Sequence, residues 1–130
     1  MKPIDLSKLK TYPLAQRKSM ATIEETLIDP ASSAPSLSSS NQKHVTQCAT
    51  DIRAAREAGA SVMYIYGAHL IKNGAHLLLD ELMNGGWITH LATNGAGVIH
   101  DWEWAFHGQS TECVRSNVAT GTFGTWEETG

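Results

Sequence analysis

The sequence predicts an α/β fold of the Rossmann-like type, in which helices flank a parallel sheet. Residues 61–67 form a short apolar segment rich in aromatic and β-branched side chains, which is typical of a buried strand. A helical pattern follows over about 70–84, and a second strand-like segment covers 87–93. Strand, helix and strand at this spacing form a βαβ unit, so we expect a parallel strand pair with a right-handed crossover.

The chain divides into two parts at the sequence level. Residues 1–40 are expected to form an N-terminal arm that ends in a Ser-rich loop at 31–40. A Ser-rich segment has too few apolar side chains to form part of a core. Within the arm, only residues 20–28 have a pattern compatible with a short helix. Residues 41–130 are expected to be the first part of a Rossmann-like nucleotide-binding domain.

The helix that should precede the first strand has an apolar stripe at three- and four-residue spacing. Ser40 or Asn41 can cap its start, and Gly59 can end it as the residue after the C-cap. The stripe consists of Val45, Cys48, Ile52 and Ala55.

Two further helices are expected, at about 98–106, ending near Gly108, and at about 111–118. Thr125 and Glu128 have the spacing of a capping box, which predicts the start of one more helix at the end of the chain. A parallel sheet of two strands is too small to bury both of its faces. We therefore expect a truncated domain, or a sheet that a partner chain completes.

Charge and hydropathy exclude several classes of function. Ten basic and thirteen acidic side chains give a net charge of −3 without a basic patch, which argues against nucleic-acid binding. No apolar run approaches the roughly 20 residues that cross a bilayer, and the N-terminus lacks the apolar stretch of a signal peptide. Cys48 and Cys113 are far apart, which favours reduced thiols in a cytoplasmic protein.

The strongest candidate for a ligand site is the edge where the two predicted strands end. The turn after the first strand begins at Gly67, and the turn after the second contains Asn94, Gly95 and Gly97. Ligands of open α/β sheets gather at the carboxyl ends of the strands. The amides of Gly95 and Gly97 could face a phosphate, and Asn94 could bond a ribose or an amide. The alternative for both turns is an ordinary strand-to-helix connection.

A polar cluster follows the second turn. His100 and Asp101 are close enough to it for a catalytic or binding role. His100, Asp101 and Glu103 also suggest a metal-dependent hydrolase as an alternative, although their spacing matches no standard zinc motif. Solvated or capping polar side chains on a helix are the simpler interpretation of the same cluster.

The segment from Gly67 to Asp101 resembles deoxyhypusine synthase and its bacterial relatives. In that family a strand leads into a turn of the type S-N-L-I-S-S-G, and a second strand leads into T-A-G-G and an acidic pair or His-Asp. Residues 68–74 and 93–97 correspond to these two turns, without gaps between them. The continuations at 98–108 and 123–130 are also similar to bacterial members, and the N-terminal third is only weakly similar.

The resemblance implies an NAD-dependent transferase that assembles as a homotetramer, with its sites between subunits. Such an enzyme dehydrogenates a polyamine or a related amine and transfers an aminoalkyl group through a lysine imine. The residues that would border the nucleotide are Gly67, Ala68, His69 and Leu70. Thr93, Asn94 and Gly95 would lie on its ribose or nicotinamide side.

Three departures from the family bear on catalysis. Ala68-His69 replaces the family's Ser-Asn, and His100 stands where an acidic residue is expected, although Asp101 is present. The family's nucleophilic lysine lies downstream of these residues, and Lys72 is not its equivalent. We therefore expect a binding half-site of such an enzyme, with a non-catalytic α/β module as the alternative.

Overall fold

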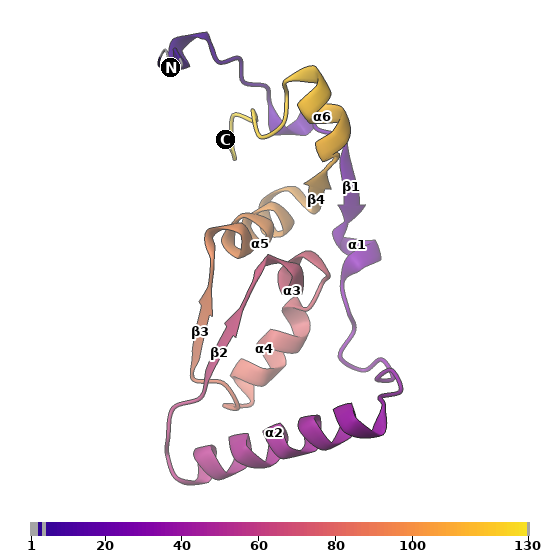
Figure 1. Cartoon of the computed structure of the whole chain (residues 1–130), viewed down its shortest axis with the longest axis vertical. Coiled ribbons are helices and arrows are strands. Elements are labelled where there is room, and N and C mark those ends of the chain that lie inside the picture. The colour runs from indigo at the N-terminus through magenta and orange to yellow at the C-terminus, as the bar shows by residue number, and fades with distance from the viewer. Residues whose placement is uncertain (1–2, 4, 130) are drawn as a thin grey trace.

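The parallel strand pair that the sequence predicts is present in the fold. The computed structural model describes residues 3 and 5–129. Strand β2 (Met63–Tyr66) pairs in parallel with β3 (His90–Thr93), in a register that joins Met63 to His90 and Tyr66 to Thr93. The fold is thus mixed α/β, and its parallel sheet has two strands (Figure 1).

A second, antiparallel sheet joins two distant parts of the chain. Strand β1 (Ser19–Thr22) pairs with β4 (Gln109–Glu112), and the short helix α1 (Ile23–Thr26) follows β1 directly. The helical interpretation of residues 20–28 is therefore wrong for their first part. The helix expected at 111–118 begins later, as α6 (Val114–Thr120). Both errors have one cause: each short strand is stabilised by hydrogen bonds to a partner about 90 residues away, which no local pattern reveals.

The helix between the parallel strands is interrupted. It consists of α3 (Ala68–Lys72) and α4 (His76–Asn84), with Gly74 between them at a φ of +84°. A Cβ on Gly74 would lie only 2.0 Å from the carbonyl oxygen of Thr26, so glycine allows the N-terminal segment to lie against this break.

The hydrophobic core lies between these helices and α5 (Gly95–His107). Its buried members are Ile71, Leu79, Ile88 and Trp104. The indole nitrogen of Trp104 donates to the carbonyl of Ile71 at 3.2 Å, which ties α5 to α3. Helix α5 begins three residues earlier than predicted because the Asn94 side chain caps it by accepting from the Gly97 amide.

The longest helix has no buried residue. Helix α2 (Ser39–Glu57) lies apart from the other helices in Figure 1, and none of its 19 residues is buried. Its N-cap is Ser38 rather than Ser40 or Asn41, because the Ser38 side chain accepts from the amide of Asn41. Gly59 follows the C-cap with a φ of +66°, as predicted.

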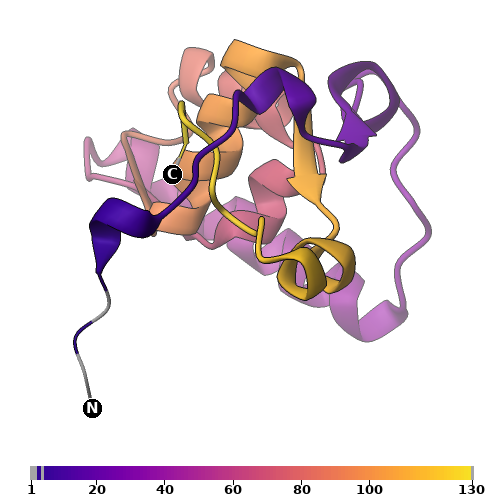
Figure 2. The same cartoon turned by 90° about the horizontal axis from the view of Figure 1, so that it is seen from above.

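The C-terminal segment runs beside the N-terminal one, as Figure 2 shows. Tyr12 forms a parallel bridge with Trp126, next to two single-turn helices, η1 (Leu6–Lys8) and η2 (Leu14–Gln16). The predicted capping box is wrong. The Thr125 hydroxyl donates to the carbonyl of Thr122, and the Glu128 carboxylate accepts from the amide of Leu14 at 2.7 Å. Among the helices of the described residues, none has both the length and the apolar character needed to cross a membrane.

Candidate functional site

The two predicted turns lie side by side at the carboxyl ends of the parallel strands. Gly67 is the N-cap of α3 and Asn94 is the N-cap of α5, and both are exposed. The Asn94 amide nitrogen lies 4.0 Å from the position that a Cβ on Gly67 would take. The fold thus brings together Gly67 and Asn94, which are 27 residues apart in the chain.

The two glycines of the second turn have different surroundings. A Cβ on Gly95 would meet no atom within 4 Å, so its backbone is open to approach. A Cβ on Gly97 would lie 2.1 Å from the hydroxyl oxygen of Thr93, and the Gly97 amide already donates to Asn94. Gly97 therefore serves internal packing, and Gly95 is the glycine that leaves room for a ligand.

The other residues predicted to border a nucleotide are distributed around this edge. The Thr93 hydroxyl donates to the carbonyl of Tyr66 at 3.0 Å, so it ties the strand ends together. Ala68 is half-buried in the first turn of α3. His69 and Leu70, with Gly67, line an open depression of about 580 Å³ that reaches Ile28 and Leu78.

His100 and Asp101 do not act as a pair in this fold. The Nδ1 atom of His100 lies 2.7 Å from the hydroxyl oxygen of Ser110. The exposed Asp101 carboxylate is instead 3.6 Å from Nε2 of His76. Because adjacent helix positions face different directions, His100 faces β4 and Asp101 faces α4.

A buried polar network surrounds His100. The Glu103 carboxylate pairs with Arg17 and accepts a hydrogen bond from Ser110, and all three residues are buried. The Arg17 guanidinium also donates to the Ser19 hydroxyl and to the carbonyl of Gln109. Sequence reasoning missed Arg17 and Ser110, and it considered Glu103 only as a metal ligand. One signal in the sequence could have indicated this network: Glu103 stands between two tryptophans. A charged side chain in an apolar helix segment is buried only when it has a partner.

The network sets the charge of its members. Burial raises the pKa of Glu103, but hydrogen bonds from Arg17 and Ser110, with the Arg17 charge, outweigh this and hold the pKa below its ordinary value. Burial lowers the pKa of His100, the charge of Glu103 opposes this, and the positive charge of Lys72 adds to the lowering. At neutral pH, Glu103 is ionised and His100 is neutral.

A cavity of about 280 Å³ opens beside this network. The charged or polar residues that line it are Arg17, Lys72, His100, Glu103, Thr111 and Glu112. Thr111 has a φ of +68°, a left-handed conformation that is strained for a β-branched residue. Strained residues of this kind are common where a fold positions groups for a ligand.

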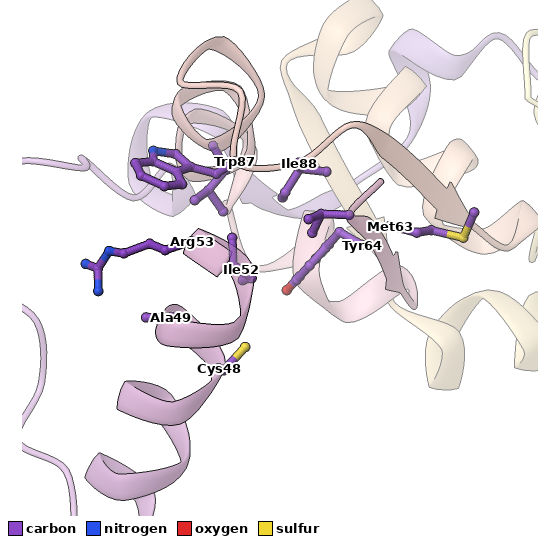
Figure 3. Close-up of a pocket in the computed structure, with 10 residues that line it drawn as sticks. Cys48, Ala49, Ile52, Arg53, Met63, Tyr64, Trp87 and Ile88 are labelled. Carbon is purple, nitrogen blue, oxygen red and sulfur yellow. The ribbon is translucent and has the colours of Figure 1, made fainter. Parts of the chain in front are cut away.

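A further depression, beside α2, is apolar. It lies between α2, β2 and residues 87–88, as Figure 3 shows. Its volume is about 380 Å³. Cys48, Ile52 and Tyr64 line it. Trp87 also lines it, and the Arg56 guanidinium lies over the Trp87 ring, 4.3 Å from the ring centroid. Polar groups do not converge in it, so this depression is suited to packing rather than to chemistry.

The hypothesis of a metal site on His100, Asp101 and Glu103 is not supported by the placement of these side chains. His100 and Glu103 are neighbours, but Asp101 lies toward His76. Within residues 3 and 5–129, no three His, Cys, Asp or Glu side chains are grouped so that they could hold a metal ion.

Comparison of the chain with protein families, with curated proteins and with solved structures finds no match.

Proposed function

We propose that the chain is the NAD-binding part of a deoxyhypusine synthase-like enzyme, with a Rossmann-like sheet to which β2 and β3 belong. The nucleotide site is the edge formed by Gly67, Asn94 and Gly95. The observation that carries the proposal is the adjacency of two strand-to-helix turns at the carboxyl ends of parallel strands, where a Cβ on Gly67 would lie 4.0 Å from the Asn94 amide nitrogen. Ligands of α/β folds bind in this position.

The chemistry of the edge suits a phosphate-bearing ligand. Helix α5 starts there, and the partial positive charge of a helix N-terminus attracts phosphate. Gly95 has no side chain to hold a ligand away from the backbone, and the Asn94 amide nitrogen is available to donate to a ribose or nicotinamide oxygen. Ala68, His69 and Leu70 border the nucleotide in this proposal.

The substrate class rests on the family resemblance. We propose a polyamine or a related amine, which is dehydrogenated before its aminoalkyl group is transferred. Of the two predicted catalytic residues, His100 lines a cavity beside Lys72, whereas Asp101 contacts His76 on the outside of α5. Of the two, His100 is therefore the one that faces a space for a bound molecule, and we place the polyamine itself at the nucleotide edge rather than beside the positive charge of Lys72.

Calorimetric titration with NAD tests the nucleotide site. Asn94→Asp keeps an oxygen that can cap α5, but it adds a negative charge beside the phosphates. We expect wild-type protein to bind NAD and the variant to lose affinity at least about tenfold with undiminished thermal stability, since a carboxylate also suits a helix N-terminus. Asn41→Asp makes the same change in the first turn of α2 and should bind NAD like wild type. Absence of NAD binding by wild type, or equal binding by Asn94→Asp, would overturn the proposal.

We also propose that the chain is a homo-oligomer. Its accessible surface is 9520 Å², about 2,800 Å² more than the roughly 6,700 Å² that a compact monomer of 14.1 kDa exposes. Standard interfaces bury about 800 Å² on each partner, so the excess is large enough for one or more of them. The exposed side chains include a stripe on α5, formed by Val98, Trp102 and Phe106, in which the last two rings stack with centroids 4.5 Å apart.

The mass of the protein in solution tests this assembly. Light scattering during gel filtration should give a multiple of 14.1 kDa for wild type. Phe106→Glu should give a smaller assembly, because a charge on the α5 stripe cannot be buried without a partner. Leu37→Glu introduces the same charge at an exposed position in the loop before α2 and should not change the mass. A monomeric wild type would refute the proposal.

The cytoplasm is the location that we propose. Cys48 and Cys113 are both free thiols, and Cys48 is exposed. Thiols persist in a reducing compartment, whereas secreted proteins tend to pair them.

A further inference from the structure

The hydrogen bonds around His100 have a defined direction. Glu103 is ionised, so its carboxylate only accepts hydrogen bonds. The single proton of the Ser110 hydroxyl is directed to Glu103. Ser110 therefore has only lone pairs left for the Nδ1 atom of His100, 2.7 Å away. It follows that Nδ1 carries a proton and donates it to Ser110.

This direction fixes the tautomer of the ring. A neutral imidazole has one N–H, and the hydrogen bond made by one nitrogen decides the state of the other. With the proton on Nδ1, the Nε2 atom carries a free lone pair. Within the described residues, Nε2 makes no hydrogen bond, and His100 lines the cavity of about 280 Å³.

We propose that Arg17, Glu103 and Ser110 are positioning residues that hold His100 in the Nδ1–H form, so that Nε2 accepts a proton or a hydrogen bond from a ligand in this cavity. The order of the contacts is Arg17 to Glu103 to Ser110 to His100. The inference goes beyond the proposed nucleotide site, because none of these four residues belongs to the edge at Gly67, Asn94 and Gly95.

The charges around the cavity select the class of ligand. Lys72 of α3 lines it and has no acidic partner within 4.0 Å among the described residues. The charges of Arg17 and Glu103 compensate each other. Glu112 of β4 uses its carboxylate to accept from Asn117, Gly124 and Trp126. These bonds engage the Glu112 carboxylate with α6 and the C-terminal segment, so Lys72 and His100 are the groups left to meet a ligand. They suit a neutral or anionic molecule with a hydroxyl group better than a diamine dication.

The first test reads the tautomer directly. Long-range proton–nitrogen NMR on protein with labelled histidine distinguishes a protonated ring nitrogen from an unprotonated one, and His100→Gln identifies the His100 signals. We expect a protonated Nδ1 and an unprotonated Nε2 in wild type near neutral pH. A protonated Nε2 of His100 in wild type would overturn the proposal.

Two variants test whether Ser110 sets the tautomer of His100 or only packs against it. Ser110→Ala removes the acceptor for Nδ1 and should shift the His100 ring toward the Nε2–H form. Ser116→Ala removes an exposed hydroxyl that bonds the Cys113 carbonyl, and it should leave the His100 signals unchanged. A folded Ser110→Ala protein with the wild-type tautomer would contradict the role of Ser110.

The ligand class has its own probes. Glycolate, which carries a hydroxyl and a carboxylate, should shift the Nε2 signal of His100 in wild type, and Lys72→Met should weaken this effect at least about tenfold, as expected for loss of a charged hydrogen bond. Propane-1,3-diamine should leave the signal unchanged. A shift with the diamine and none with glycolate would overturn the ligand class. NAD titration of the same samples reports on the nucleotide site separately.

Discussion

The interior around α5 and β4 and the surface around β2 and β3 reverse the usual distribution of side chains. In the first region, Arg17 and Glu103 are 6% and 4% exposed, although both carry a charge. In the second, Met63 and Ile65 are 58% and 72% exposed, although both are apolar. The polar interior is closed by its own hydrogen bonds, whereas the apolar strands have one face without a cover.

The difference lies in where each region finds its partners. Arg17 and Glu103 are 86 positions apart, and the N-terminal segment crosses the molecule to complete the network. Strands β2 and β3 are close in sequence and pair with each other, but a two-stranded sheet leaves its second face uncovered. The polar region is thus complete within this chain, and the apolar region is suited to an additional surface.

Breaking the buried ion pair between Arg17 and Glu103 should have the largest effect on the free energy of unfolding. Glu103→Gln leaves the Arg17 charge buried without its partner, which typically costs about 3–5 kcal/mol of folding free energy. The midpoint of urea unfolding measures this loss. The double variant Arg17→Met/Glu103→Leu removes both charges and should recover much of the stability, because an apolar pair of similar volume has no charge to desolvate. A Glu103→Gln protein as stable as wild type would show that the polar region is not closed by this pair.

Alanine substitutions at the two glycines of the second turn should affect the stability of the protein differently. Gly97→Ala forces a methyl group against Thr93, whose hydroxyl holds the end of β2, and overpacking of this kind costs about 1–3 kcal/mol. Gly95→Ala meets open space and should be neutral or stabilising by about 0.5–1 kcal/mol, as expected when alanine replaces a helical glycine. Thermal unfolding compares the two, and equal effects would contradict the assigned surroundings.

The polar region should also weaken as the pH falls. Burial lowers the pKa of His76 and of His100 below the ordinary value of 6.5, and charges of nearby carboxylates oppose this only in part. Below pH 6.5 the histidines of the unfolded chain therefore bind more protons than those of the folded chain. The free energy of unfolding is thus largest above this pH, and it decreases as the pH falls toward the pKa values of the folded state. Neither ring nitrogen of His76 has a hydrogen-bond partner among the described residues, which adds to the cost of charging it.

Urea midpoints at about pH 7.5 and about pH 5.5 measure this slope. His76→Phe keeps a ring that can lie edge-on to Trp104, as His76 does, and it should reduce the loss between the two conditions. His44→Gln, at an exposed position of α2, should keep the wild-type slope. The interpretation fails if His76→Phe loses as much stability as wild type.

The exposed sheet face should give the smallest effect on the isolated chain. Ile65→Thr keeps β-branching at a position that is 72% exposed, so the free energy of unfolding should change by less than about 0.5 kcal/mol. The same variant should weaken self-association if this face is part of the interface. A large loss of stability in dilute protein would show that Ile65 is already covered.

The local patterns predicted the elements that depend on local residues. The parallel pair, the Gly59 helix end and the stop at Gly108 all follow from short motifs, and Gly108 closes α5 with a φ of +66°. What the patterns missed depends on distant partners. Strand β1 exists because β4 lies beside it, and Glu128 bonds the amide of Leu14 instead of capping a helix.

The candidate site divides in the same way. Glycine and asparagine after a strand identified the edge at Gly67 and Asn94, because strand ends and caps have local signatures. The link from His100 to Arg17 has no such signature, since its members come from the N-terminal segment, α5 and β4. Spacing also placed Asp101 with His100, whereas helix geometry turns the two side chains to different neighbours.

Helix α2 has a consequence for how the molecule opens. With none of its residues buried, α2 is held mainly by its own backbone hydrogen bonds, its Ser38 cap and the contact of Arg56 with the ring of Trp87. Most of the stability of a helix in a protein comes from the packing of its apolar face, which α2 largely lacks. Amide protons of α2 should therefore exchange with solvent long before those around Trp104, in a separate event that leaves the core folded. Binding of another surface along α2 would slow this exchange. The exchange rate of the α2 amide protons therefore shows whether another surface covers the helix.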